Sequence, residues 1–130
     1  MSVKTLVILM SALAGIAAMA GGPCAAEHDP AAKIFNTYCS PCHGETGGGN
    51  GPIGDVLARK PRNFTDCDQM KKLSDDHIFK VIKEGGRGAG LSPESPMPRW
   101  QVGFTDEDIH ALVKHLRLYC TKPGLTFHNK

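Results

Sequence analysis

The segment Cys39-Ser40-Pro41-Cys42-His43 constrains this chain more than any other part of its sequence. Two thiols three positions apart can reach two points on one edge of a flat macrocycle, and the adjacent histidine then projects beneath it. This C-x-x-C-H pattern is the attachment signature of a haem whose vinyl groups bond to the two sulfurs and whose iron binds the imidazole. The sequence therefore predicts one covalent haem c, held by Cys39, Cys42 and His43.

Two other interpretations of this cysteine pair have less support. A thiol–disulfide redox centre is expected where a strand meets a helix, and the residues around Cys39 show no strand pattern. A zinc site needs four clustered ligands, whereas Cys67 and Cys120, the cysteines that follow the motif, do not form a second short-spaced pair. We therefore expect haem attachment rather than either alternative.

The N-terminal segment has the pattern of an export leader. Lys4 precedes a largely apolar stretch over residues 6–20, and small residues follow it. The stretch is shorter than the roughly 20 residues that cross a bilayer, so we expect a cleaved signal peptide over residues 1–26. Cleavage before Gly21 is an alternative. The domain over residues 27–130 is then expected in the periplasm, because haem of this kind is attached after export.

The rest of the chain predicts an all-α domain. Helices are expected at about residues 30–41, from Ser74 to about Gly85 and from Thr105 onward, each after a capping residue, with a short turn at 53–57. Segments rich in glycine and proline separate them, and no alternating pattern is long enough for a strand pair. Three to four short helices make a thin core. We therefore expect them to wrap around the haem, which fills the centre.

These features resemble the class I (mitochondrial-like) monohaem cytochromes c, especially the small bacterial periplasmic type and the cytochrome c domains of terminal oxidases. The resemblance covers about residues 30–120 and rests on CSPCH, GETGGGNGPIG, SPMPRW and the closing amphipathic helix. It implies a few helices around one haem, with the first and last helices crossing. It also implies that a proline carbonyl accepts a hydrogen bond from the haem-binding histidine, a role that Pro52 would take.

Met97 is the expected ligand on the other face of the iron. It lies between Pro96 and Pro98, which have no backbone N–H and a restricted φ, so the loop can hold a thioether at a fixed distance. Its late position also matches the distal segment of the resembled family. Met70 is more simply a core residue. Among the histidines, His77 is the strongest alternative candidate for the iron ligand. The other interpretation of His77 is a surface residue beside acidic neighbours.

Other residues are candidates for contacts around the haem. Trp100 can donate its indole N–H to a haem propionate or pack on the ring, and Arg62 and Arg99 are candidate partners for the propionates. Cys67 and Cys120 can form a disulfide in an oxidising compartment. The sequence alone does not show that these two cysteines meet.

The expected function is electron transfer rather than enzyme catalysis, because a histidine and a methionine on the iron leave no position for a substrate. The net charge of +2 argues against binding to nucleic acid. The expected partners are donor and acceptor redox proteins, respiratory or periplasmic oxidoreductases, without stable membrane insertion. Two alternatives remain open: a haem enzyme or gas-binding protein with a displaceable sixth ligand, and a fixed cytochrome subunit of a respiratory complex.

Overall fold

The computed structural model describes residues 29–122 and 124, and its regular structure is helical with no strand in that part of the chain. The predicted leader over residues 1–26 lies outside the described residues. The elements in chain order are α1 Pro30–Ile34, the π-helical turn η1 Phe35–Cys39, α2 Ser40–His43, the 3-10 turn η2 Gly54–Val56, α3 Cys67–Met70, α4 Asp75–Gly88 and α5 Asp106–Thr121. The all-α prediction is confirmed. Within the described ranges, no helix is long and apolar enough to span a membrane.

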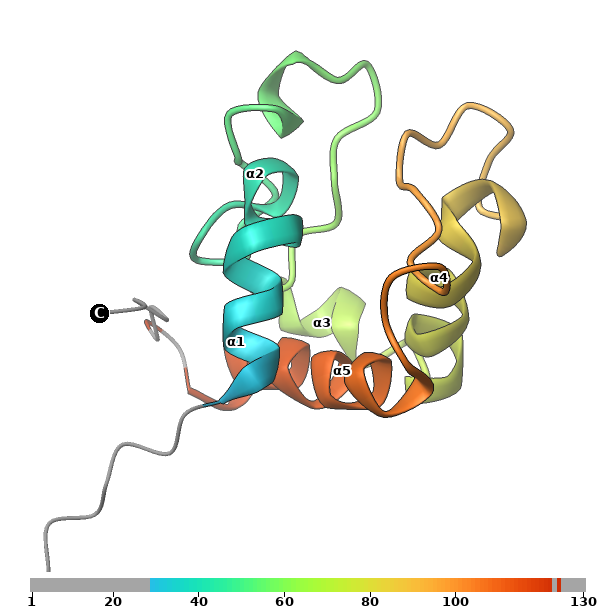
Figure 1. The fold of residues 1–130 in the computed structure, drawn as a ribbon. Helices are drawn as coiled ribbons and strands as arrows, with labels where there is room; N and C mark the ends of the chain where they lie inside the picture. Colours follow the sequence, from blue (N-terminus) through green and yellow to red (C-terminus); the bar gives the residue numbers. More distant parts are fainter. Residues whose placement is uncertain (1–28, 123, 125–130) are drawn as a thin grey trace, which may run out of the picture.

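Two groups of helices, called uprights here, stand on a common base formed by α5: α1 with α2 makes one upright, and α4 makes the other (Figure 1). Helix α5 runs along the base, α1 crosses it near its C-terminal end, and α4 packs against its N-terminal half. The short α3 lies between the uprights, above α5. The segments 44–66 and 89–104 rise on the α1 side and the α4 side respectively, so that they face each other across the middle of the molecule.

The core lies where the uprights meet α5. The apolar face that the sequence indicated consists of Ile109, Leu112, Val113 and Leu116, and all four are buried in one cluster that also contains Phe35 of η1. Full burial of one such side chain contributes about 1.5–3 kcal/mol to folding. This face of α5 therefore supplies much of the apolar contact that holds the two uprights in place.

The long helices begin at the capping residues that the sequence indicated. The Thr105 hydroxyl accepts a hydrogen bond from the Asp108 N–H at 3.2 Å, and the Asp108 carboxylate accepts one from the Thr105 N–H at 3.0 Å. In α4, the Ser74 hydroxyl accepts from the His77 N–H at 3.1 Å. Such caps satisfy backbone donors that have no partner inside the helix, each typically worth about 1 kcal/mol.

The first helix differs from the prediction of one regular helix over residues 30–41. Its hydrogen bonding changes to the wider π pattern over Phe35–Cys39, and α2 then continues through the C-x-x-C-H motif. Pro41 has no N–H to donate to the preceding turn. The Ser40 hydroxyl donates to the Asn36 carbonyl instead, at 2.7 Å. The helix therefore passes the proline without ending.

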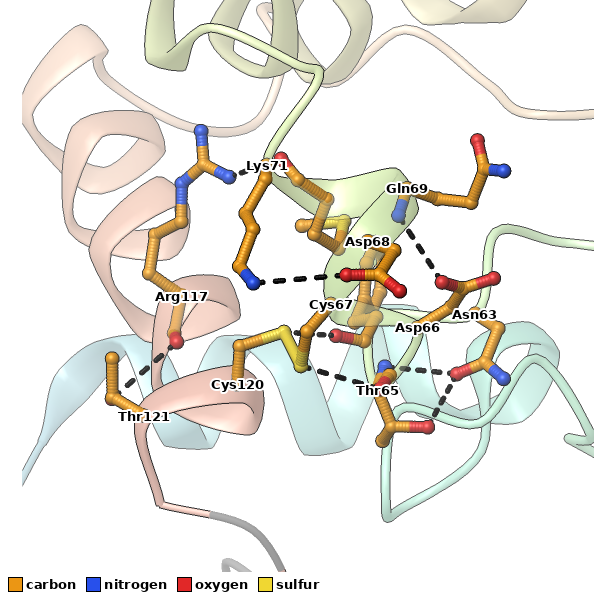
Figure 2. The surroundings of a disulfide bond; sticks show 12 residues. Asn63, Thr65, Asp66, Cys67, Asp68, Gln69, Lys71, Arg117, Cys120 and Thr121 are labelled. Carbon is orange, nitrogen blue, oxygen red and sulfur yellow. Dashed lines mark hydrogen bonds and ion pairs between the residues drawn. A yellow bond between two sulfur atoms is a disulfide. The ribbon is translucent and has the colours of Figure 1, made fainter.

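A disulfide between Cys67 and Cys120 joins α3 to the end of α5, with the two Cα atoms 5.5 Å apart (Figure 2). The pairing that the sequence left open is therefore present. Arg117 on α5 strengthens the same junction, because its guanidinium donates to the carbonyls of Met70 at 2.7 Å and Leu73 at 2.6 Å. Helix α3, which the sequence did not predict, is thus held by α5.

A buried histidine joins α5 to the start of α1. His115 Nδ1 lies 3.0 Å from one carboxylate oxygen of Asp29, and the other oxygen accepts from the Ala31 N–H at 3.0 Å. The His115 ring packs against Phe35, with 5.4 Å between the ring centroids. Burial lowers the pKa of His115, while the hydrogen bond and the charge of Asp29 act in the opposite direction.

We expect the holoprotein to lose stability in mild acid because of His115. A histidine whose folded pKa is lowered binds protons preferentially in the unfolded chain, so its stabilising effect is fully present above the unfolded pKa of about 6.5 and is lost as pH falls through the folded value. Denaturant unfolding measured from about pH 7.5 down to about pH 5 checks this. The His115→Gln variant should show a flatter pH dependence, and the variant of exposed His110→Gln should behave as wild type. Equal slopes for wild type and His115→Gln would contradict the assignment.

Candidate haem site

A cavity of about 810 Å³ opens between the two uprights of the fold. Its lining comes from η1 and α2, from the segment 53–64 and from α4 with the segment 95–100, and apolar side chains predominate. The buried side chains of Leu112 and Leu116 on α5 form its floor. The volume lies in the upper part of the range for pockets that bind small molecules and cofactors.

The C-x-x-C-H motif lies on one wall of this cavity. Cys39 from the end of η1, and Cys42 and His43 from α2, all line it. Both thiols are free and partly buried. Burial raises the pKa of Cys39 to about 12, and the nearby Cys42 adds to the effect. Burial thus keeps the Cys39 thiol neutral, and the helical turn sets the separation of the two sulfurs that line the cavity.

His43 is oriented by two contacts. Its Nδ1 lies 3.0 Å from the Arg62 carbonyl, and its ring stacks on Phe64 with 4.6 Å between centroids and 18° between planes. A carbonyl only accepts, so Nδ1 carries the proton and the Nε2 lone pair remains to bind a metal. Burial lowers the pKa of His43, against the opposing effect of the hydrogen bond to Arg62. The neutral ring that a metal requires is therefore favoured.

The expectation that the Pro52 carbonyl accepts from His43 is not met, because the Arg62 carbonyl takes that place. Pro52 is exposed. Its loop instead turns backbone amides toward α2: Gly49 N–H donates to the His43 carbonyl at 2.7 Å, Gly51 N–H to that of Cys42 at 3.1 Å and Ile53 N–H to that of Pro41 at 2.9 Å. These bonds satisfy the last carbonyls of a short helix, which otherwise lack partners. The loop thus fixes the motif through backbone hydrogen bonds.

Met97 lines the same cavity from the opposite side, together with its neighbours Pro96 and Pro98. It is partly buried and packs against the core. An adjoining cavity of about 70 Å³ is also bordered by Met97 and by His43. The structure thus brings the two expected axial ligands to one space, although the sequence places them far apart.

The two alternative candidates for the iron ligand, Met70 and His77, do not line the larger cavity. Met70 is 2% exposed and belongs to the core cluster. His77, near the start of α4, is partly buried. Both side chains border the smaller cavity and neither is among the lining residues of the larger one. Their placement supports Met97 as the candidate ligand.

Trp100 lines the cavity next to the Met97 segment. Its ring stacks on Phe104, with 5.3 Å between centroids, and meets the edge of Tyr38 at 5.7 Å. This cluster joins the turn before α5 to η1 across the rim of the cavity. Trp100 therefore packs within an aromatic cluster beside the cavity, and a contact between its indole and the haem stays a prediction.

The charged side chains that line the larger cavity are all basic, among the residues that the structure describes. They are Arg59, Lys60 and Arg62, close together on one strip of chain. Lys60 also pairs with Asp55 at 3.6 Å. Arg99, the other candidate partner for the propionates, is exposed and is not part of the lining. The basic strip therefore marks the side of the cavity where negatively charged propionates would be favourable.

Two parts of the site had no signal in the sequence analysis. The Arg62 carbonyl is a backbone acceptor, and residue type does not reveal which carbonyl a distant histidine will meet. Phe64 could not be distinguished from any other apolar residue, because its burial and its stacking on His43 are known only from the structure. With the thiols, the imidazole, the thioether and the apolar walls, these residues fit a covalently attached haem.

Known proteins share this fold and sequence pattern. The family model "Cytochrome C oxidase, cbb3-type, subunit III" matches residues 26–116. The solved KustC0563 c-type cytochrome is 31% identical over 69% of this chain and 96% of its own, with a TM-score of 0.56. A mutant of that cytochrome is 32% identical over 67% and 94% of the two chains, with a TM-score of 0.54.

One further solved structure belongs to an assembly. A chain of the Kuenenia stuttgartiensis reducing HAO-like protein complex Kustc0457/Kustc0458 is 28% identical, with a TM-score of 0.56. The match covers 69% of this chain and 41% of that one. No curated protein matches this chain.

Proposed function

This chain belongs to the cytochrome c family described as cytochrome c oxidase, cbb3-type, subunit III, and on that basis we propose that it carries single electrons between redox proteins of the periplasm. The family and the c-type cytochrome neighbours support a covalently bound haem c and an electron carrier. The observation that carries the finer proposal is that His43, from α2, and Met97, from the segment that packs on α4, both line one apolar cavity. This placement is the one that class I cytochromes c require.

Each residue of the cavity has a distinct task in this proposal. The bound haem supplies the one-electron couple of its iron. Cys39 and Cys42 would hold the macrocycle by thioether bonds, and the His43 imidazole and the Met97 thioether would both bind the iron, so that no position would remain for a substrate. Because a thioether is a weaker donor than an imidazole, Met97 would favour the reduced state and raise the potential above that of a haem with two histidines.

The periplasmic location rests on two features of the chain. The N-terminal segment over residues 1–26 has the pattern of a cleaved leader. The Cys67–Cys120 disulfide is of a kind that persists in oxidising compartments and is rare in the cytosol. Both features support export of the domain over residues 27–130.

The basic strip Arg59, Lys60 and Arg62 supports partners with acidic surfaces. Arg59 and Arg62 are exposed at the rim of the cavity, where electrons would enter and leave. Complementary charge mainly accelerates the encounter of two proteins and is weakened by salt. Respiratory or periplasmic oxidoreductases with acidic docking surfaces fit this rim as donors and acceptors.

Carbon monoxide distinguishes the carrier from a haem enzyme or gas-binding protein. We expect the reduced holoprotein to keep its spectrum when carbon monoxide is added, because Met97 occupies the sixth position. We also expect a redox titration to follow one reversible one-electron step. Rapid binding of carbon monoxide by the native protein, or peroxide consumption clearly faster than without the protein, would favour the enzyme or gas-binding alternative.

A fixed cytochrome subunit of a larger redox complex is the second candidate. The similar chain in the Kuenenia stuttgartiensis assembly supports it. Val56 and Val102, which are 83% and 84% exposed, are apolar positions that a partner subunit could cover. Purification of the tagged protein from the membrane and soluble fractions of its native cells distinguishes a fixed subunit from a free carrier. Recovery at a fixed ratio with other subunits favours the complex, and recovery as a free monomer favours the carrier.

A further inference from the structure

The segment that carries Met97 lies directly on the C-terminal end of α4. Three backbone hydrogen bonds join them: Gly86 N–H to the Met97 carbonyl at 3.1 Å, Trp100 N–H to the Ile82 carbonyl at 3.2 Å and Gln101 N–H to the Lys83 carbonyl at 3.2 Å. The Arg87 Nε–H adds a bond to the Ser95 carbonyl at 3.2 Å. The end of the helix therefore serves as a surface that holds the loop of the proposed iron ligand.

Gly85 breaks the helix at this surface. Its φ of +74° and ψ of 168° are not helical, and a residue with a side chain rarely adopts such a φ. A Cβ at this position would also lie 2.8 Å from the Arg99 nitrogen and 2.9 Å from the Met97 carbonyl oxygen. Both are backbone atoms that cannot rotate away. Conformation and space thus require glycine here.

Gly86 makes an equally close contact with the other end of the same segment. It is buried, and a Cβ built on it would overlap Ser95 Oγ and lie 2.6 Å from Ser95 Cβ. Ser95 is 7% exposed, so it has little room to move aside. The same Cβ would lie 3.6 Å from the Met97 Cβ, which is an ordinary contact. At position 86, the obstacle is therefore Ser95 alone.

We propose that Gly85 and Gly86 are positioning residues for Met97. Their missing side chains let residues 95–99 lie flat on α4, and this fixes how far the Met97 thioether reaches into the cavity. A side chain at either position lifts the segment from the helix and weakens the bond between the thioether and the iron. The inference rests on the proposed function, in which Met97 is the sixth ligand.

The test measures how readily the thioether leaves the iron, by the rate at which carbon monoxide binds the reduced holoprotein. Overpacking of a tight contact typically shifts an equilibrium by about tenfold or more, so Gly86→Ala should bind carbon monoxide about tenfold faster than wild type. The visible spectrum of the oxidised variant should show partial loss of methionine ligation. A purely structural defect would lower the unfolding midpoint without opening the sixth position.

A second substitution at Ser95 makes the test specific. Ser95→Gly removes both atoms that the new Cβ meets, so the double variant Gly86→Ala/Ser95→Gly should return to within about twofold of the wild-type rate, as expected for directly coupled positions. Ser95→Ala keeps the Cβ and should not restore the rate. If Gly86→Ala does not accumulate as haem-loaded protein, Ser95→Thr adds a methyl group to the buried side chain at the same contact, and it should accelerate carbon monoxide binding in the same direction.

Two control variants separate this contact from general effects of removing a glycine. Gly103→Ala places its Cβ no closer than 4.0 Å to the Trp100 carbonyl oxygen, and Gly88→Ala meets only the Glu84 side chain. Both should bind carbon monoxide as slowly as wild type. If the wild type and the variants Gly86→Ala and Ser95→Thr all bind carbon monoxide equally slowly, the positioning role alone is overturned. A wild type as fast as Met97→Ala would instead overturn Met97 as the ligand, and with it the proposed function.

Discussion

Replacing Met97 by histidine should lower the midpoint potential of the holoprotein by roughly 0.1 V or more, because axial ligands set haem potentials over a wide range. Imidazole is a stronger donor than a thioether and stabilises the oxidised iron. The haem should stay six-coordinate, whereas Met97→Ala should leave a position that carbon monoxide fills. A redox titration followed by the visible spectrum measures the first effect, and gas binding measures the second.

Two variants serve as controls for this prediction. Met70→Leu replaces a core residue by one of similar volume, and His77→Asn removes the strongest histidine rival. Neither side chain lines the larger cavity, so neither change should move the potential appreciably. A potential that rises in His77→Asn but is unchanged in Met97→His would transfer the ligand role to His77, because loss of an imidazole ligand destabilises the oxidised iron.

Loss of the Cys67–Cys120 disulfide is the second change with a large expected effect. The bond closes a loop with a sequence separation of 53, and the chain-entropy relation gives a stabilisation of about 4 kcal/mol for a loop of this length. The double variant Cys67→Ala/Cys120→Ala should therefore unfold at a temperature lower by roughly 15–30 °C. Denaturant unfolding followed by haem absorbance and circular dichroism measures the free energy directly.

Reduced wild-type protein is the matched control for the disulfide variant, since it lacks the same bond and keeps both side chains. The two should unfold at similar denaturant concentrations. Thiol titration of the unfolded, unreduced holoprotein should find no free cysteine, because Cys39 and Cys42 are bonded to the haem in this account. Two reactive thiols that trace to Cys67 and Cys120, or a loss of stability below about 1 kcal/mol, would contradict the stabilising role.

The candidate ligand residues stand out in the sequence because their side-chain chemistry is rare and their spacing is strict. Cys39, Cys42 and His43 form a local pattern within one helical turn, and Met97 stands out between two prolines. The acceptor for His43 could not be predicted in this way. Any backbone carbonyl can serve, and the fold decides which one is near; here it is that of Arg62, on a segment that the family resemblance did not point to.

The fold shows the same division between local and tertiary effects. Ser74 and Thr105 precede acidic first turns and apolar faces, so the starts of α4 and α5 could be located from the sequence. Helix α3 has only four residues, Cys67–Met70, which is too short to show a period. Its disulfide and the guanidinium of Arg117 hold it in place. Contacts between distant segments, rather than local preference, determine such elements.

The most direct test of this account is an intact-mass measurement together with acid–acetone extraction, on protein matured in a host that attaches haem c. The account predicts that the colour stays with the polypeptide and that the mass equals the exported chain plus one haem. The variant Cys39→Ala/Cys42→Ala should release its pigment under the same treatment. A colourless wild-type protein, or pigment that passes into the solvent, would contradict covalent attachment and the function built on it.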